Sequence, residues 1–87
     1  MATIWVPSPL RPLCGGATRL HVDGATLGDV LRAVEVRCPG FLDEILDNGR
    51  LRPEIAIAID GEAGSYSLHE QLAPGTEISI LPAMAGG

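Results

Sequence analysis

The chain has 87 residues with a formal net charge of −5, and 46% of them are hydrophobic. This length predicts one domain with a single core, and the hydrophobic content is too high for a disordered chain. An acidic surface repels phosphate backbones and suits a basic protein partner, so we expect no nucleic-acid partner. The longest apolar run, residues 55–59, is far short of the roughly 20 residues that span a bilayer, so we expect no membrane partner.

The two cysteines, Cys14 and Cys38, are too few and too far apart in sequence for a four-ligand metal site. Three prolines lie within residues 7–12, and no uninterrupted apolar stretch precedes a small-residue cleavage site, so we expect no secretory signal peptide. We therefore expect a cytoplasmic protein with reduced thiols and no bound metal, while a disulfide between the two cysteines stays open.

The first half of the chain predicts two strands and a helix. Residues 3–6 are β-branched or aromatic, and residues 18–22 alternate, so both predict strands, which we expect to pair as a hairpin. The proline- and glycine-rich residues 7–16 predict a loop or wide turn. Thr26 is a candidate helix N-cap with Asp29 completing a capping box. The amphipathic stripe that follows consists of Leu27, Val30, Leu31 and Val34.

The helix is expected to end at Cys38-Pro39-Gly40, and residues 41–46 to add a short helical turn. Residues 55–59 alternate isoleucine with alanine and are the clearest strand. Residues 66–72 are irregular, and residues 76–81 predict the last strand, which Pro82 ends. We expect residues 1–82 to be the folded domain and residues 83–87 to be a flexible tail.

A mixed sheet with one main helix packed on one face satisfies the two-layer rule and predicts an α+β protein with the β-grasp arrangement. The predicted core is aliphatic and contains Ile4, Val6, Leu20, Val22, Leu27, Val30, Leu31, Val34, Ile55, Ile57, Ile59, Leu72, Ile78 and Ile80.

The C-terminal segment carries the most specific motif. A small acidic β-grasp chain ending in Gly86-Gly87 resembles the ubiquitin-like sulfur carriers, which include the small subunit of molybdopterin synthase, the thiazole-synthesis carrier and the cysteine-biosynthesis carrier. Pro82 followed by Ala83-Met84-Ala85-Gly86-Gly87 is most similar to the cysteine-biosynthesis branch, as are residues 7–12 and 26–30.

This resemblance implies that an activating enzyme uses ATP to adenylate the Gly87 carboxylate, and that sulfur then displaces AMP to leave a thiocarboxylate. A sulfur-accepting synthase, cysteine synthase-like by the tail, would be the second partner; molybdopterin, thiamine and specialised-metabolite synthases stay open. The chain itself needs no catalytic residue and binds no cofactor, so we expect a carrier rather than an enzyme.

The length and the small residues of the tail suit the delivery of its C-terminal carboxylate into a partner's active site. Five residues beyond Pro82 extend at most about 17 Å, enough to enter a cleft while the folded body stays outside. Gly86 and Gly87 lack a Cβ atom, so a narrow channel admits them. We expect the segment that threads into the partner's active site to be Ala83, Met84, Ala85 and Gly86.

Alternation places Trp5, Ala56, Ala58 and Leu81 on the sheet face away from the helix, which predicts a flat apolar docking patch unless loops or a second copy cover it. No Ser, Cys or Asp lies at a sequence spacing from His21 or His69 that would indicate acid–base catalysis, so we expect both histidines on the surface. Two other functions stay open: a protein modifier that joins Gly87 to lysines, and a plain interaction domain with no activated terminus.

Overall fold

The computed structural model describes residues 1–64 and 66–82, with Pro82 described by its backbone alone. A five-stranded sheet with the order β2-β1-β7-β5-β6 forms one layer. The central strands β1 and β7 are parallel, and every other neighbouring pair is antiparallel. The sheet strands are β1 (Ala2–Trp5), β2 (Arg19–Val22), β5 (Ile55–Ile59), β6 (Glu62–Gly64) and β7 (Glu77–Pro82).

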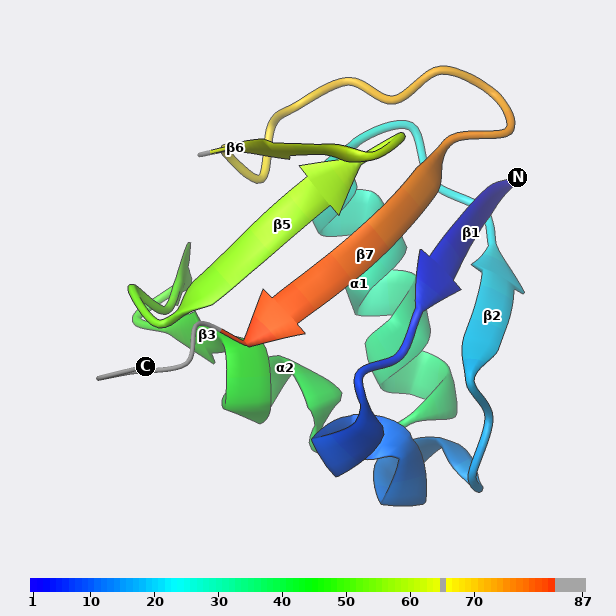
Figure 1. The fold of residues 1–87 in the computed structure, drawn as a ribbon, viewed down its shortest axis with the longest axis vertical. Coiled ribbons are helices and arrows are strands. Elements are labelled where there is room, and N and C mark those ends of the chain that lie inside the picture. The colour runs from blue at the N-terminus through cyan, green and yellow to red at the C-terminus, as the bar shows by residue number, and fades with distance from the viewer. Residues whose placement is uncertain (65, 83–87) are drawn as a thin grey trace.

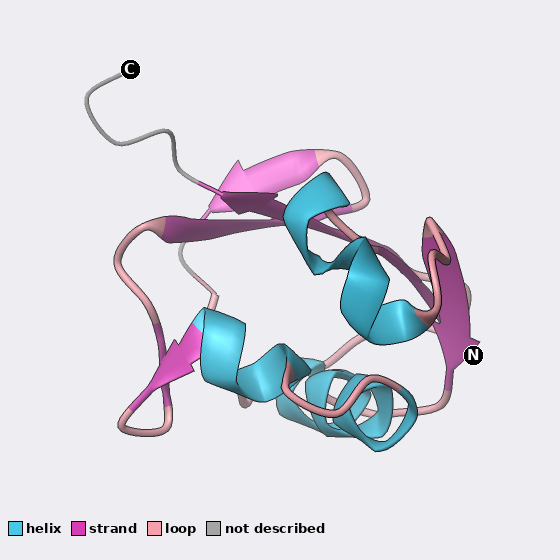
Figure 2. Cartoon of the chain, turned by 90° about the horizontal axis from the view of Figure 1, so that it is seen from below, coloured by secondary structure: helices cyan, strands magenta, loops and turns pink. Residues whose placement is uncertain are grey.

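Helix α1 (Leu27–Arg37) lies across one face of the sheet. Figure 1 looks onto the opposite face with α1 behind it, and Figure 2 shows the helices gathered on one side of the sheet. The predicted N-cap is confirmed, because the Thr26 hydroxyl accepts a hydrogen bond from the Asp29 amide at 3.2 Å. Arg32 donates to the Asp29 carboxylate at 2.7 Å and, with Thr26, holds the pKa of Asp29 below its usual value. The predicted β-grasp arrangement is confirmed.

The prediction of a loop over residues 7–16 was wrong, because Ser8–Cys14 forms a 3-10 helix, η1. Its prolines fix φ near −65°, a value that a 3-10 helix also uses, and the Leu10 amide donates to the Pro7 carbonyl at 2.9 Å. Gly15, at φ +64°, ends η1 in the left-handed region. The helix places the buried side chain of Leu10 against the core.

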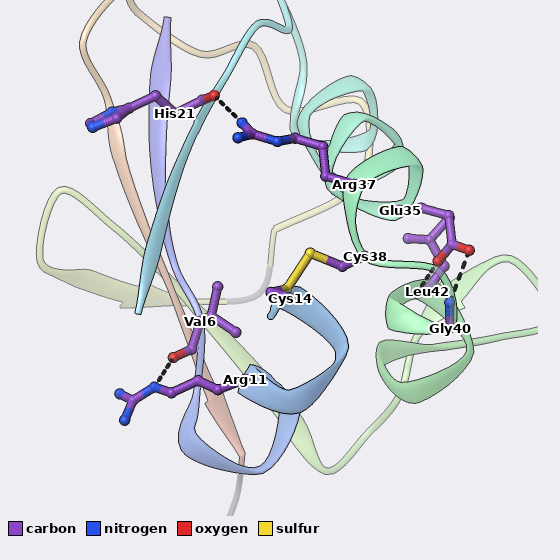
Figure 3. Close-up of a disulfide and its surroundings, with 9 residues drawn as sticks. All are labelled: Val6, Arg11, Cys14, His21, Glu35, Arg37, Cys38, Gly40 and Leu42. Carbon is purple, nitrogen blue, oxygen red and sulfur yellow. Dashed lines mark hydrogen bonds between the residues drawn. A yellow bond between two sulfur atoms is a disulfide. The ribbon is translucent and has the colours of Figure 1, made fainter. Parts of the chain in front are cut away.

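The expectation of reduced thiols is also corrected: Cys14 and Cys38 form a disulfide between the end of η1 and the C-cap of α1 (Figure 3). Their Cα atoms lie 4.7 Å apart although 24 positions separate them in sequence. The sequence did not predict this pairing, because it depends on η1, which folds the proline-rich segment back toward the end of α1. Cys38 is fully buried in the core cluster.

A turn at Gly40 leads from α1 into the short helix α2 (Phe41–Ile45). The Glu35 carboxylate accepts hydrogen bonds from the amides of Leu42 at 2.8 Å and Gly40 at 3.1 Å (Figure 3). These amides hold the pKa of Glu35 below its usual value, with the Leu42 amide contributing most. A separate hairpin then follows, formed by β3 (Leu46–Asp47) and β4 (Arg50–Leu51).

The core contains most of the predicted residues. Three predicted residues are less buried than expected, and several buried residues were not predicted. Ile55, Ile59 and Leu72 are only partly buried. Ile55 lies on the part of β5 that β6 does not cover, because β6 pairs with residues 57–59 alone. The sequence analysis missed five residues of the core cluster, namely Ala2, Leu10, Cys38, Phe41 and Ile45. Within residues 1–64 and 66–82, no helix is long and apolar enough to cross a bilayer.

Candidate functional site

The predicted reactive residue, Gly87, and the threading residues Ala83, Met84, Ala85 and Gly86 lie outside the described residues. The structure does describe the base from which they extend. Strand β7 ends at Pro82, which is paired with Ile55 of β5. Strand β7 is paired with β1 over residues 77–79 and with β5 over residues 78–82, so β5 holds the end from which the tail extends.

The predicted docking residues share one face of the sheet. Trp5 on β1 pairs with Ser79 on β7, and Ser79 pairs with Ala58 on β5. One step further along β7, Leu81 pairs with Ala56. Directly opposed residues in neighbouring strands point to the same side of a sheet. Trp5, Ala56, Ala58 and Leu81 therefore form a continuous surface on the side away from α1, and we call these four residues the outer patch.

Within the outer patch, the two large side chains stand exposed and the alanines form a floor. Trp5 is 37% exposed and Leu81 is 44% exposed. Ala58 is only 7% exposed, because its neighbours across the strands, Ser79 and Ala63, surround a small side chain. The patch is thus a shallow surface with an aromatic and an aliphatic projection, the composition that recurs in protein interfaces.

Polar neighbours fix the orientation of Trp5. Its indole Nε1 donates to the Glu77 carboxylate at 3.2 Å, and the Arg19 guanidinium carbon lies 5.6 Å from the ring centroid. Arg19 and Glu77 lie on the strands that flank β1, so the ring is held from both sides. Sequence analysis missed both residues, because only the order of the strands shows which side chains flank the tryptophan.

The structure also contains an open groove of about 940 Å³ that the sequence did not indicate. It lies where β5 extends beyond its partner β6, opposite the β3–β4 hairpin and residues 66–69. Its lining combines the hydrophobic Ile55, Leu51 and Tyr66 with Arg50 and Arg52. Ala56 is the one outer-patch residue that also lines this groove, so the two surfaces meet at β5.

The two candidate histidines make contacts at the surface. His21 and His69 are exposed, as predicted. His21 lies 3.0 Å from the Thr3 hydroxyl, and His69 donates its amide to the Ser67 hydroxyl at 3.1 Å. An activated nucleophile needs a neighbouring base that burial or an acidic side chain holds in place. Neither of these exposed contacts provides that arrangement.

Comparison with known proteins identifies the family. The model of the ThiS family matches residues 4–87. The sulfur carrier protein CysO of Mycobacterium tuberculosis is 33% identical over 90 residues, which cover 98% of this chain and 97% of that protein. Small archaeal modifier protein 3 of Haloferax volcanii is 30% identical over 67 residues, 75% of this chain and 73% of that protein.

Solved structures agree with these sequence matches. The structure of an Amycolatopsis orientalis BexX/CysO complex contains a chain that superposes with a TM-score of 0.91 at 29% identity, covering all of both chains. M. tuberculosis CysO superposes with a TM-score of 0.89 at 30% identity over 97% of this chain and 100% of that one. The fold, the residues matched and the extent of the match lead to one conclusion: this chain belongs to the ThiS family.

Proposed function

We propose that this chain is a sulfur carrier that works through the carboxylate of Gly87. An activating enzyme adenylates that carboxylate with ATP, a sulfur donor converts it to a thiocarboxylate, and a biosynthetic synthase accepts the sulfur. The observation that carries the proposal is the ThiS family match, which extends to Gly87. The M. tuberculosis relative, described as a sulfur carrier protein, matches over nearly the whole length of both chains and supports the same function.

The chemistry needs no general base on the carrier. A terminal carboxylate has a pKa of about 3.5 and is anionic at neutral pH, so it can attack the α-phosphate of ATP directly. That attack forms the acyl-adenylate and expels pyrophosphate. A sulfur nucleophile then adds to the acyl carbon and AMP leaves, which exchanges one carboxylate oxygen for sulfur. The carrier contributes the acyl group and its placement, and the partner enzymes supply catalysis, ATP and an enclosed site.

Two partners follow from this cycle: the activating enzyme and the sulfur-accepting synthase. The outer patch is the surface we propose for docking, because it is apolar, lies on the central strands and leads along β7 to Pro82. The chain in the A. orientalis complex, which resembles this one over its full length, supports a partner-bound state. By the resemblance of the tail to the cysteine-biosynthesis carriers, we propose a cysteine synthase-like acceptor and a cycle that runs in the cytoplasm.

The intact mass of the protein tests the proposal. We expect incubation with the activating enzyme, ATP and a sulfur source to produce a species in which one oxygen is replaced by sulfur, and tandem mass spectrometry to place it on Gly87. A variant lacking Gly86 and Gly87 is the control and should keep its original mass. An intact chain that stays unmodified in the complete reaction would refute the carrier function.

A second function is favoured by one observation, the similarity to small archaeal modifier protein 3. A modifier shares the adenylation step but transfers the Gly87 acyl group to a lysine amine, forming an isopeptide bond. Branched peptides that carry Gly-Gly on target lysines in native cells would establish it. If deletion of Gly86 and Gly87 has no effect on any function in the cell, the chain is instead an interaction domain.

A further inference from the structure

Every basic side chain of this protein is an arginine. The six Lys and Arg residues are all arginine, and none of the 87 residues is a lysine. At three of the six positions, local contacts do not require this choice. Arg11, Arg37 and Arg52 each donate to a main-chain carbonyl, of Val6, His21 and Asp43, at 3.1, 3.0 and 2.9 Å. A lysine ammonium can make a single hydrogen bond of this kind equally well.

The two cations differ in their reactivity toward an activated carboxyl group. A lysine amine has a pKa near 10.4, so a small neutral fraction is always present and can attack an acyl carbon. A guanidinium stays protonated and delocalised at every physiological pH and has no free electron pair to donate. An all-arginine surface therefore supplies positive charge without nucleophiles. This difference matters only if the C-terminus is activated, so the inference rests on the proposed function.

One amine remains, and the fold keeps it away from the tail. The ammonium group of Met1 lies 3.9 Å from the Asp23 carboxylate. The Met1 carbonyl accepts a hydrogen bond from the Gly75 amide at 3.0 Å, which places Met1 beside the start of β7. Figure 1 shows β7 running from this end of the molecule to the opposite one. Thr3 is in register with Glu77, five positions before Pro82, and Met1 lies two positions before Thr3, next to the start of β1. Met1 and Pro82 are therefore about 23 Å apart at roughly 3.3 Å per strand residue.

A five-residue segment anchored at Pro82 extends at most about 17 Å, which is less than the separation of about 23 Å between Met1 and Pro82. The Gly87 carbonyl therefore cannot reach the Met1 amine of its own chain. The parallel pairing of β1 and β7 is the cause, since it places the start of β1 beside the start of β7 rather than beside its end.

We propose that this chain has no amine within reach of its activated terminus, so that the Gly87 acyl group reaches only a nucleophile brought by a partner. The reaction avoided is aminolysis: the amine nitrogen forms a bond to the acyl carbon, the bond from that carbon to the AMP oxygen breaks, AMP leaves with the electron pair, and the nitrogen loses a proton to water. A second consequence concerns conjugates: copies of this chain cannot join one another through lysine, so each modified lysine on a target carries a single copy.

The test places a lysine within reach of the tail. Pro82 pairs with Ile55, and the Ile55 amide donates to the Arg52 carbonyl at 2.9 Å, so position 52 lies about 12 Å or less from Pro82. Arg52→Lys therefore introduces an amine that the tail can reach. The exposed Arg50→Lys, in the same hairpin, is a second variant in case the Asp43 contact matters for folding.

Arg37→Lys is the matched control, with the same charge and the same chemical change. The Arg37 side chain contacts His21, which is in register with Thr3 and Glu77. That position is two strands across from β7 and five residues before Pro82, or roughly 19 Å away. A lysine at position 37 therefore starts farther from Pro82 than one at position 52 and should cyclise less than Arg52→Lys.

The probe is the C-terminal glycine thioester of each protein, prepared chemically and held at micromolar concentration near pH 9, which raises the neutral fraction of lysine. Intramolecular attack proceeds at an effective concentration near millimolar, so we expect Arg52→Lys to form at least about tenfold more cyclised chain than the other proteins. This product weighs one water less than the hydrolysed chain. Wild type should yield the hydrolysed carboxylate alone, and Arg37→Lys should give far less cyclised chain than Arg52→Lys.

Two results would overturn the proposal: cyclised wild type joined at Met1, or no cyclisation of folded Arg50→Lys and Arg52→Lys. Because the thioester is made without any activating enzyme, these results do not depend on whether the cell activates the chain. The proposed function is tested separately by the mass of the enzyme-treated protein, so either idea can fail while the other stands.

Discussion

Trp5 is the residue with the largest expected effect on partner binding. Its ring is partly exposed, and contacts with Arg19 and Glu77 hold it in one orientation before any partner arrives. A pre-oriented aromatic side chain loses little conformational entropy on binding, which is why tryptophan is enriched among the residues that dominate interfaces. The hydrophobic core lies on the other side of β1, so the ring adds little to folding.

We expect Trp5→Ala to weaken binding to the activating enzyme by roughly 30-fold or more, the loss typical of an interface hot spot. Val36→Ala is the control, because Val36 is 82% exposed on α1, away from the outer patch. Titration calorimetry measures both affinities, and circular dichroism checks the fold. Unfolding of Trp5→Ala, or an affinity equal to that of Val36→Ala, would show that the outer patch is not the docking surface.

At the scale of elements, Glu35 connects α1 to α2. Its carboxylate accepts from two amides in the turn that follows α1, and their donors hold its pKa below the usual 4.5. A carboxyl group whose pKa is lower in the folded state stabilises the fold above the pKa it has when unfolded. This contribution is lost as the pH falls through the folded-state pKa. The junction should therefore weaken in acid.

We expect Glu35→Gln to lower the melting temperature at neutral pH and to reduce its dependence on pH below about 4.5, since the amide has no charge to lose. Glu44→Gln, on the exposed side of α2, is the matched control. Thermal unfolding of both variants across the acidic range measures the effect. Identical pH profiles for Glu35→Gln and the wild type would show that the carboxylate does not stabilise the turn.

Periodicity decided which elements the sequence predicted. The alternation in residues 55–59 and the stripe in α1 are repeated signals, and both elements formed as expected. Segment η1 has no such repeat, and its prolines suit a loop and a 3-10 helix equally. The three-residue strand β6 is too short to show alternation, and it forms because it pairs with the edge of β5. Such elements depend on tertiary contacts that no local pattern contains.

The same distinction applies to the site. Alternation alone placed Trp5, Ala56, Ala58 and Leu81 on one face, since each side chain follows from its position in a strand. Their neighbours Arg19 and Glu77 required the strand order, which joins residues from distant parts of the chain. The roles of Gly87 and the tail remain predictions, because they concern chemistry with partners.

For the whole molecule, the Cys14–Cys38 disulfide is the one covalent link between distant segments within the part of the chain described. It joins η1 to the end of α1, and both cysteines lie in or against the core cluster that also contains Leu10 and Phe41. A cross-link stabilises mainly by restricting the unfolded chain, and a separation of 24 residues corresponds to roughly 3–4 kcal/mol. The remaining core does not depend on the bond, so reduction of the disulfide should lower stability and leave the fold intact.

We therefore expect a thiol reductant to lower the free energy of unfolding in urea by roughly 3 kcal/mol, while the Trp5 fluorescence of the folded protein and its affinity for the activating enzyme stay unchanged. Cys14→Ala is the control and should respond to reductant in neither measurement. It is preferable to a substitution of Cys38, which is fully buried and whose truncation would also leave a cavity. Two titratable thiols in the unreduced native protein would show that the bond is absent. A loss of binding on reduction would instead mean that η1 holds the nearby end of β1, and with it Trp5, in the orientation that the partner requires.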